Sequence, residues 1–241
     1  MLTLSNLTVF VAEKKILDNI NYCFEKGKIY VIMGPNGSGK SSLAHTIMGN
    51  PLYLVSKKSK LLFQKQNITT FSTDKRAKKG IFLSFQSPLS LSGVSIFQLM
   101  RTALGGKQDV LKLKIKMEKF AKELHITQDL MERSFNEGAS GGEKKKLEVL
   151  QAAVLEPKLA ILDEVDTGVD IDALKQMFSF LKKRRKENTY IFITHNGKIL
   201  SYLKPDVVLI MKKGKLVQEG NSKLIEQINT YGYENSKKRT S

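Results

Sequence analysis

The residues with the most specific chemistry in this chain form one glycine-rich segment, Gly34-Pro35-Asn36-Gly37-Ser38-Gly39-Lys40-Ser41. A glycine, four variable residues and then Gly-Lys-Ser are typical of a phosphate-binding loop. In such a loop the glycines let backbone N–H groups surround the α- and β-phosphates of a nucleotide. Lys40 would reach the β- and γ-phosphate oxygens, and the Ser41 hydroxyl would be a ligand of Mg²⁺. The segment therefore predicts a nucleotide site.

The residues on either side of this loop have the character that a phosphate-binding loop requires. Residues 29–33 form a β-branched and aromatic run that favours a strand. Residues 42–48 are compatible with a helix, because Leu43, Ile47 and Met48 fall on one stripe. The order strand, loop, helix is the context that supports the motif.

Polar residues directly follow three further runs that have strand character. They are Gln86, the neighbouring carboxylates Asp163 and Glu164, and His195. In a parallel α/β sheet, ligands bind at the carboxyl ends of the strands, so we expect these side chains to meet near the loop.

Each of these residues has a chemical interpretation and a plainer alternative. Asp163 would be a second-shell partner of Mg²⁺, and Glu164 would accept a proton from an attacking water or orient it. His195 would hydrogen-bond the γ-phosphate or the water, and Gln86 would coordinate Mg²⁺ or the water. The plainer interpretation is a strand that ends in surface carboxylates, with a structural histidine elsewhere.

A second anion-seeking helix terminus is predicted at Ser140-Gly141-Gly142-Glu143, which opens a helical pattern. The glycines allow close backbone approach, and a helix N-terminus favours negative charge. The alternative is a capping box between Ser140 and Glu143, and both interpretations can hold together. The chain then has two helix N-termini suited to phosphate binding. This suggests that the one at Ser140 binds a nucleotide held by another subunit.

The order of elements along the chain predicts an α/β fold. Strands alternating with helices indicate a parallel sheet covered on both faces. Alternating residues from Leu2 to Phe24 predict an antiparallel β flap ahead of the loop. Residues 87–154 show helical patterns and no strong strand, which predicts an inserted helical subdomain. Residues 235–241 are polar and charged, and we expect them to form a flexible tail.

Composition excludes several classes of protein. No apolar run approaches eighteen residues, so no membrane-spanning helix is expected, and the first residues do not resemble a secretory signal. The only cysteine, Cys23, excludes an intrachain disulfide, fits a reducing compartment and cannot by itself hold an iron–sulfur cluster.

The net charge of +17 suggests either a nucleic-acid surface or lysines on solvated faces. The lysines are dispersed along the chain. Those between residues 110 and 124 fall on the outer face of an amphipathic helix. Nucleic-acid binding is therefore the less favoured interpretation.

Taken in order, these motifs resemble those of the ATP-binding cassette (ABC) ATPases. Residues 34–41 match Walker A, Gln86 the Q-loop, Ser140 to Glu143 the signature, 159–164 Walker B, 167–170 with Asp170 the D-loop, and His195 the H-loop. The resemblance implies a P-loop NTPase core that binds ATP and Mg²⁺ and hydrolyses ATP. It adds Ser42 to the ATP-binding residues. Two cassettes of this family face head to tail, so that the signature of one completes the site of the other.

The resemblance also implies the organisation of the chain. We expect a single cassette over residues 1–234, in which 1–86 and 155–234 form the nucleotide-binding core with its flap. Residues 87–154 would form the helical subdomain that carries the signature.

A narrower resemblance is to the SufC-type ATPases of the SUF iron–sulfur cluster assembly system. The segments that carry it are 33–40, 80–88, 140–145, 155–164, 170–175 and 204–206. It implies SufB-like and SufD-like scaffold partners that hold the cluster ligands, a second copy of this chain in the ATP-bound state, and a cytoplasmic location or an organellar stroma. The alternative that stays open is the nucleotide-binding subunit of an ABC membrane transporter.

Overall fold

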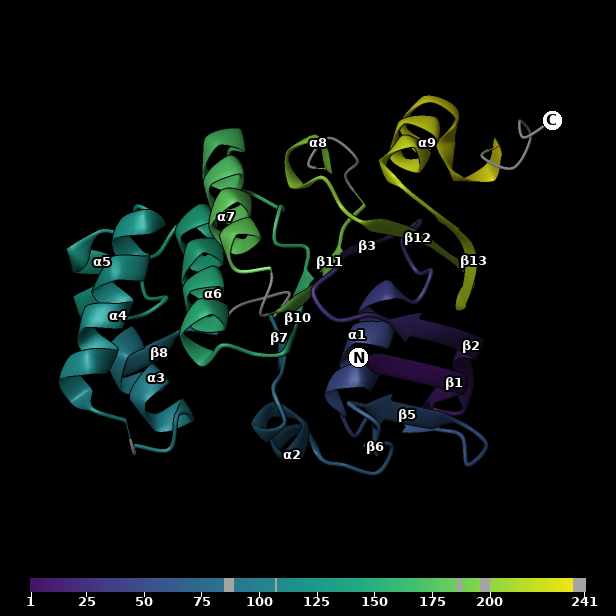
Figure 1. Ribbon diagram of the computed structural model, residues 1–241, viewed down its shortest axis with the longest axis horizontal. Helices are drawn as coiled ribbons and strands as arrows, with labels where there is room; N and C mark the ends of the chain where they lie inside the picture. Colours follow the sequence, from purple (N-terminus) through teal and green to yellow (C-terminus); the bar gives the residue numbers. More distant parts are fainter. Residues whose placement is uncertain (85–88, 107, 186–187, 196–199, 236–241) are drawn as a thin grey trace.

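The computed structural model describes residues 1–84, 89–106, 108–185, 188–195 and 200–235 (Figure 1). At its centre is a six-stranded sheet that is parallel except for one edge strand. In spatial order its strands are β13 (Lys215–Gly220), β12 (Val207–Lys212), β3 (Ile29–Met33), β11 (Thr189–Ile193), β10 (Leu159–Asp163) and β7 (Ile81–Leu83).

Every residue of β3, β10 and β11 is buried, as expected for central strands covered on both faces. Alternate side chains of these strands belong to two different hydrophobic clusters. One cluster packs against α6 (Gly141–Leu155), α7 (Ile171–Lys183) and α9 (Ser222–Asn235). The other packs against α1 (Lys40–Met48) and a second sheet.

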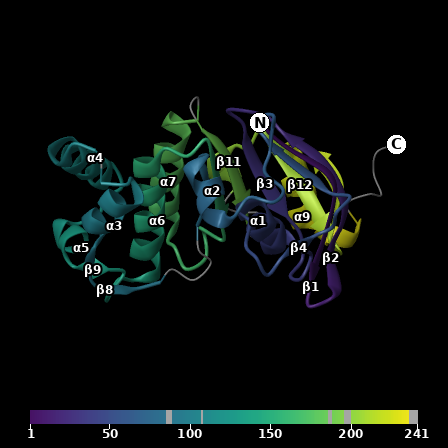
Figure 2. The same ribbon diagram turned by 90° about the horizontal axis from the view of Figure 1, so that it is seen from below.

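The second sheet is antiparallel and forms the predicted flap at one end of the molecule (Figure 2). Its strands are β2 (Lys14–Phe24), β1 (Leu2–Val11), β5 (Lys60–Phe63) and β6 (Gln66–Asn67), with β4 (Leu54–Val55) paired to β1. Leu2, Leu4, Leu7 and Val9 on β1 are all buried, so the alternation along this strand puts one face into the core.

A helical region lies at the opposite end of the molecule (Figure 2). It contains α3 (Ile96–Ala103), α4 (Val110–Glu123) and α5 (Gln128–Glu132), which pack beside α6. The α/β fold with a β flap and an inserted helical region is thereby confirmed. The domain boundaries at 86/87 and 154/155 stay a prediction.

Residues 87–154, in which the sequence showed no strong strand, contain a short pair of strands. Leu91–Ser95 (β8) pairs antiparallel with Ser134–Phe135 (β9), with a register shift between the two paired positions. These strands are short and mostly not buried, so their local sequence lacks the apolar run that marks a core strand. They are brought together by the helices between them.

The end of α1 is fastened by an arginine on the short helix α2 (Thr73–Lys78). The buried Arg76 guanidinium donates to Thr46 O and Ile47 O at 2.8 Å each, and to Phe71 O and Thr69 O at 2.9 Å. These bonds satisfy carbonyls that the last turn of a helix leaves open. Burial lowers the pKa of Arg76 to about 10. The C-terminal end of the phosphate-loop helix is therefore held by the bonds from Arg76 to Thr46 and Ile47.

The remaining short helix is α8 (Leu200–Leu203). Asn235 ends α9, and the rest of the predicted tail lies outside the described residues. Within the described ranges, none of the helices has the length and apolar character needed to cross a bilayer.

Candidate nucleotide site

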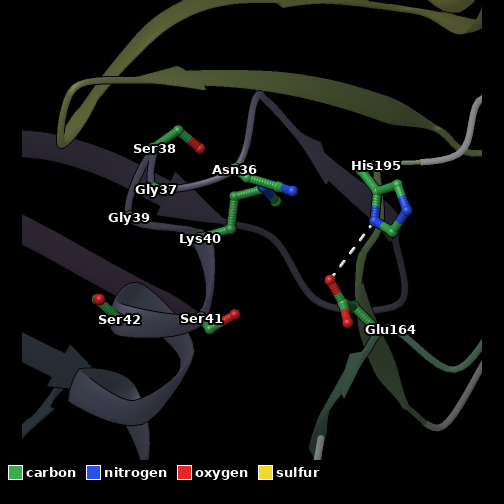
Figure 3. Close-up of a pocket in the computed structure, with 9 residues that line it drawn as sticks. All are labelled: Asn36, Gly37, Ser38, Gly39, Lys40, Ser41, Ser42, Glu164 and His195. Carbon is green, nitrogen blue, oxygen red and sulfur yellow. Dashed lines mark ion pairs between the residues drawn. The ribbon is translucent and has the colours of Figure 1, made fainter. Parts of the chain in front are cut away.

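A cavity of about 520 Å³ opens at the carboxyl edge of the parallel sheet (Figure 3). Its lining residues are Asn36, Gly37, Ser38, Gly39, Lys40, Ser41, Ser42, Glu164 and His195. The first seven come from the loop between β3 and α1 and from the start of α1, Glu164 follows β10, and His195 follows β11. The structure thus brings the predicted loop, Glu164 and His195 to one place.

Two glycines of the loop are required by close approaches. A Cβ atom at Gly34 would lie 2.2 Å from Met211 O on β12, and one at Gly39 would lie 2.9 Å from a methyl carbon of Leu17. Gly39 also has φ 102°, which L side chains rarely adopt. The loop can therefore sit against β12 and β2 only with glycine at these positions.

Lys40 is held on its own loop. Its Nζ donates to Gly34 O at 2.8 Å and to Pro35 O at 3.1 Å, and the residue is 7% exposed. Burial lowers the pKa of Lys40, while the nearby carboxylates Glu164 and Asp163 act in the opposite direction. A phosphate group in the cavity would favour the charged amine further, because it brings negative charge into a desolvated place.

Asp163 ends β10 beneath the loop and is 2% exposed. Its backbone N–H donates to Ser84 Oγ at 2.9 Å. Burial raises the pKa of Asp163, while a hydrogen bond with Ser41 lowers it. Among the described residues, its Oδ1 atom has no hydrogen-bond partner. A buried carboxylate oxygen with open coordination beside a serine hydroxyl is a donor set that suits Mg²⁺.

Glu164 and His195 lie next to each other on one side of the cavity, and the phosphate loop lies on the other side (Figure 3). Glu164 Oε1 lies 3.5 Å from His195 Nδ1, as the dashed line in Figure 3 marks. Glu164 has φ 50°, and its N–H donates to Ile193 O at 2.9 Å, in line with the end of β11. A non-glycine residue in this left-handed region is uncommon, and the β11 contact holds it there.

The turn after Glu164 contains a buried contact that the sequence did not indicate. Thr194 Oγ1 donates to Asp166 Oδ2 at 2.8 Å, and Asp166 is 7% exposed. Burial raises the pKa of Asp166, while this hydrogen bond lowers it. Because Thr194 directly precedes His195, the contact fixes the ends of β10 and β11 relative to each other.

The signature segment lies elsewhere, at the start of α6. Glu143 N donates to Ser140 Oγ at 3.3 Å, and Ser140 N donates to Glu143 Oε2 at 2.8 Å, so the capping box is present. None of the residues 140–143, all of which the structure describes, lines the cavity.

The remaining predicted site residues have different outcomes. Asp170 caps α7, because its Oδ1 accepts from Ala173 N at 2.8 Å. A Cβ atom at Gly141 would lie 3.4 Å from Gly168 O, so the signature and the turn that precedes α7 are neighbours. Gln86 lies outside the described residues.

A metal site built from several His, Cys, Asp or Glu side chains is not seen in the described residues. No group of three or more His, Cys, Asp or Glu side chains there is arranged to hold a metal ion. A magnesium site at Asp163 and Ser41 would not belong to that kind of group, since it takes one carboxylate and one hydroxyl from the protein.

The burial of Asp163 gives a testable effect on stability. The pKa of Asp163 is higher in the folded chain than the ordinary value of 3.8, because burial disfavours the charged carboxylate. The folded state is therefore favoured by protonation of Asp163. The free energy of unfolding should fall as pH rises from 3.8 through the raised pKa. We expect Asp163→Asn to raise the melting temperature of the nucleotide-free protein at pH 7, with a gain that shrinks toward pH 4. Thermal unfolding against pH measures this, with the exposed Asp172→Asn as control. A lower melting temperature at pH 7 would contradict the cost ascribed to the buried charge.

Comparisons with known proteins agree with this geometry. Residues 17–167 match the ABC transporter family. The chain is 39% identical to the probable ATP-dependent transporter ycf16 of Antithamnion sp., over 97% of this chain and 96% of that protein. It is 39% identical to vegetative protein 296 of Bacillus subtilis (strain 168), over 97% and 92% of the two chains.

A solved structure shares the fold. It is the dimeric post-hydrolysis state of an ATP-binding cassette bound to ADP and Pi, with a TM-score of 0.79 at 19% identity, over 92% of this chain and 99% of that one. The family match and the long, similar relatives establish the family. The chain therefore belongs to the ABC transporter family, as an ATP-binding ATPase subunit.

Proposed function

We propose that this chain is the Mg²⁺-dependent ATP-hydrolysing subunit of a SufC-type complex for iron–sulfur cluster assembly. The observation that supports hydrolysis most directly is the shared cavity of Lys40, Glu164 and His195 beside the buried Asp163. These groups supply a cation for phosphate, a carboxylate for water and a donor for a phosphate oxygen. Phosphoryl transfer depends mainly on such positioning and charge.

The roles follow from the positions. The N–H groups of the loop and of the first turn of α1 surround the phosphates, and Lys40 leaves its loop carbonyls for the β- and γ-phosphate oxygens. Glu164 accepts the proton of the attacking water or orients it, and His195 bonds the γ-phosphate. Ser41, Asp163 and, on the resemblance, Gln86 would hold Mg²⁺. The ion, when bound, would neutralise phosphate charge.

The site is proposed to be completed by a second copy. Ser140 to Glu143 open α6 and do not line the cavity, which supports a site in which a second copy supplies the helix N-terminus that meets the γ-phosphate. The similar ATP-binding cassette is dimeric in its post-hydrolysis state, which agrees with this arrangement. Asp170 and its turn, next to Gly141, would lie at the same interface.

Removing the carboxylate of Glu164 tests the hydrolytic role. We expect Glu164→Gln to lower kcat for ATP at least about a hundredfold, because proton transfer and water orientation are lost. Binding of Mg-ATP should change little, since the amide keeps the shape of the side chain. Phosphate release measures the first and calorimetry the second, with the exposed Glu13→Gln as control. Unchanged kcat would remove Glu164 from the mechanism.

Mixing two inactive variants tests the shared site. Lys40→Ala and Ser140→Arg should each abolish ATP hydrolysis when alone. A mixed pair, however, keeps one site with an intact loop and an intact signature. An equal mixture should therefore recover about one quarter of the wild-type rate, because half of the pairs are mixed and each has one of two sites. No recovery, with mixed pairs shown by sedimentation, would refute a site shared between copies.

The assignment to iron–sulfur assembly rests on the narrower resemblance and on the single cysteine, Cys23, which leaves the cluster ligands to partners. SufB-like and SufD-like scaffolds in the cytoplasm are the proposed partners, with an organellar stroma as the alternative location. A transporter subunit is the second candidate function, because a relative that is 39% identical is described as a probable ATP-dependent transporter. Both candidates use the same site.

Capture of the stable partners separates these candidates. We expect affinity purification of the tagged chain from its own cells to retain two soluble scaffold proteins in the absence of detergent. A parallel purification from detergent-solubilised membranes should retain no permease. Recovery of a membrane permease in stoichiometric amount, without the scaffolds, would overturn the assembly role and leave ATP hydrolysis in place.

A further inference from the structure

A buried hydrogen bond joins the two chain segments that carry Glu164 and His195. Thr194 Oγ1 donates to Asp166 Oδ2 at 2.8 Å, and the two residues are 2% and 7% exposed. Thr194 directly precedes His195 in the chain, and Asp166 lies two residues after Glu164. The bond therefore fastens the residue beside His195 to the turn that begins with Glu164.

The turn after β10 is attached to β11 by its backbone and by a side chain. Glu164 N donates to Ile193 O at 2.9 Å, and within the turn Thr167 N donates to Glu164 O at 3.2 Å. The side-chain attachment is the bond from Thr194 to Asp166. The backbone bond alone would leave the turn able to rotate about it. The side-chain bond adds a second fixed point, which sets the direction in which the Glu164 side chain leaves the strand.

Thr194 is itself held by the strand that leads into the phosphate loop. Its N–H donates to Ile32 O on β3 at 3.2 Å, and β3 ends directly before Gly34. The position of Thr194 is thus set by the same strand that sets the start of the loop. Through Thr194, the turn that carries Glu164 is fixed relative to the phosphate-binding residues.

The position of Glu164 needs such support. Its Oε1 lies 3.5 Å from His195 Nδ1 (Figure 3), and both side chains line the cavity. Its backbone is in the left-handed region, with φ 50°, which a non-glycine residue rarely adopts. A residue keeps such a conformation only where the surrounding contacts hold it. The bond between Thr194 and Asp166 is one of these contacts.

We propose that Asp166 and Thr194 are positioning residues for ATP hydrolysis, whose hydrogen bond holds Glu164 beside His195 in the direction from which it meets the attacking water. The role rests on the proposed use of Glu164 in hydrolysis and adds the pair that sets its geometry. The structure describes both Asp166 and Thr194, and neither lines the cavity, which supports a role through Glu164. Loss of the bond should therefore slow the chemical step and leave nucleotide binding to the loop unchanged.

The test compares variants that keep or remove the hydroxyl of Thr194. Thr194→Val has nearly the same shape but cannot donate, whereas Thr194→Ser keeps the hydroxyl. Thr189→Val is the matched control, because Thr189 is buried at the other end of β11 and its hydroxyl bonds Glu25 O at 3.3 Å. Phosphate release at saturating Mg-ATP gives kcat, and calorimetry with Mg-ADP gives the dissociation constant. Thermal unfolding shows whether the fold is kept.

We expect Thr194→Val to lower kcat about tenfold, because a displaced carboxylate orients the water poorly. The dissociation constant of Mg-ADP should stay within twofold of wild type, because the loop is unaltered. Thr194→Ser should restore most of the rate. Thr189→Val should lower the melting temperature and leave kcat at the wild-type value. Equal kcat of Thr194→Val and Thr189→Val would refute the positioning role.

A double variant separates failure of the pair from failure of the proposed site. Glu164→Gln removes the carboxylate through which the pair is proposed to act, so adding Thr194→Val to it should lower kcat less than twofold further. Effects that multiply would show that Thr194 acts independently of Glu164 and would overturn the positioning role. If Glu164→Gln alone keeps the wild-type kcat, the proposed hydrolytic site itself fails.

Substitutions of the acceptor keep the test decisive if Thr194→Val does not fold. Asp166→Asn keeps an oxygen that accepts the hydrogen bond, and Asp166→Ala removes it. Asp166→Asn should therefore keep most of kcat, whereas Asp166→Ala should lower kcat about tenfold with the dissociation constant of Mg-ADP unchanged. Equal kcat of these two variants would overturn the role of the hydrogen bond.

Discussion

The register of the central parallel sheet is the constraint on which the site depends. Asp163 on β10 and Ile32 on β3 both pair with Ile193 on β11, so the three strand ends lie in one row. The residues that follow each end, among them Glu164 and the phosphate loop, must then emerge side by side. A slip of one residue would turn Asp163 to the other face of the sheet. The register of these strands thus fixes where the residues of the site lie.

Burial gives this site an unfavourable set of charges that a nucleotide relieves. The pKa of Lys40 is lowered and those of Asp163 and Asp166 are raised, in each case chiefly by desolvation. Phosphates bring negative charge to Lys40, and a divalent cation brings positive charge to Asp163. On the proposed function, binding of Mg-ATP would release part of the free-energy cost that burial of these charges imposes on folding.

The sequence predicted those parts of the site that are formed by residues close together in the chain. The phosphate loop, the strand before it and the capping box at Ser140 follow from residue types at short spacing. What it could not predict depends on distant segments that meet only after folding. The hydrogen bonds between Ser84 and Asp163 and between Thr194 and Asp166 each join residues that are far apart in the sequence. No local pattern marks them. The short pair β8 and β9 was missed for the same reason.

The central claim, that two copies share each ATP site, is tested most directly by the dependence of hydrolysis on protein concentration. The measurement is the steady-state ATP hydrolysis rate per subunit, at saturating Mg-ATP, across a dilution series whose association state is followed by sedimentation. A shared site predicts that the rate per subunit falls on dilution in step with loss of the dimer and saturates when dimers are complete. A rate per subunit that stays constant down to concentrations at which only monomers sediment would contradict the account.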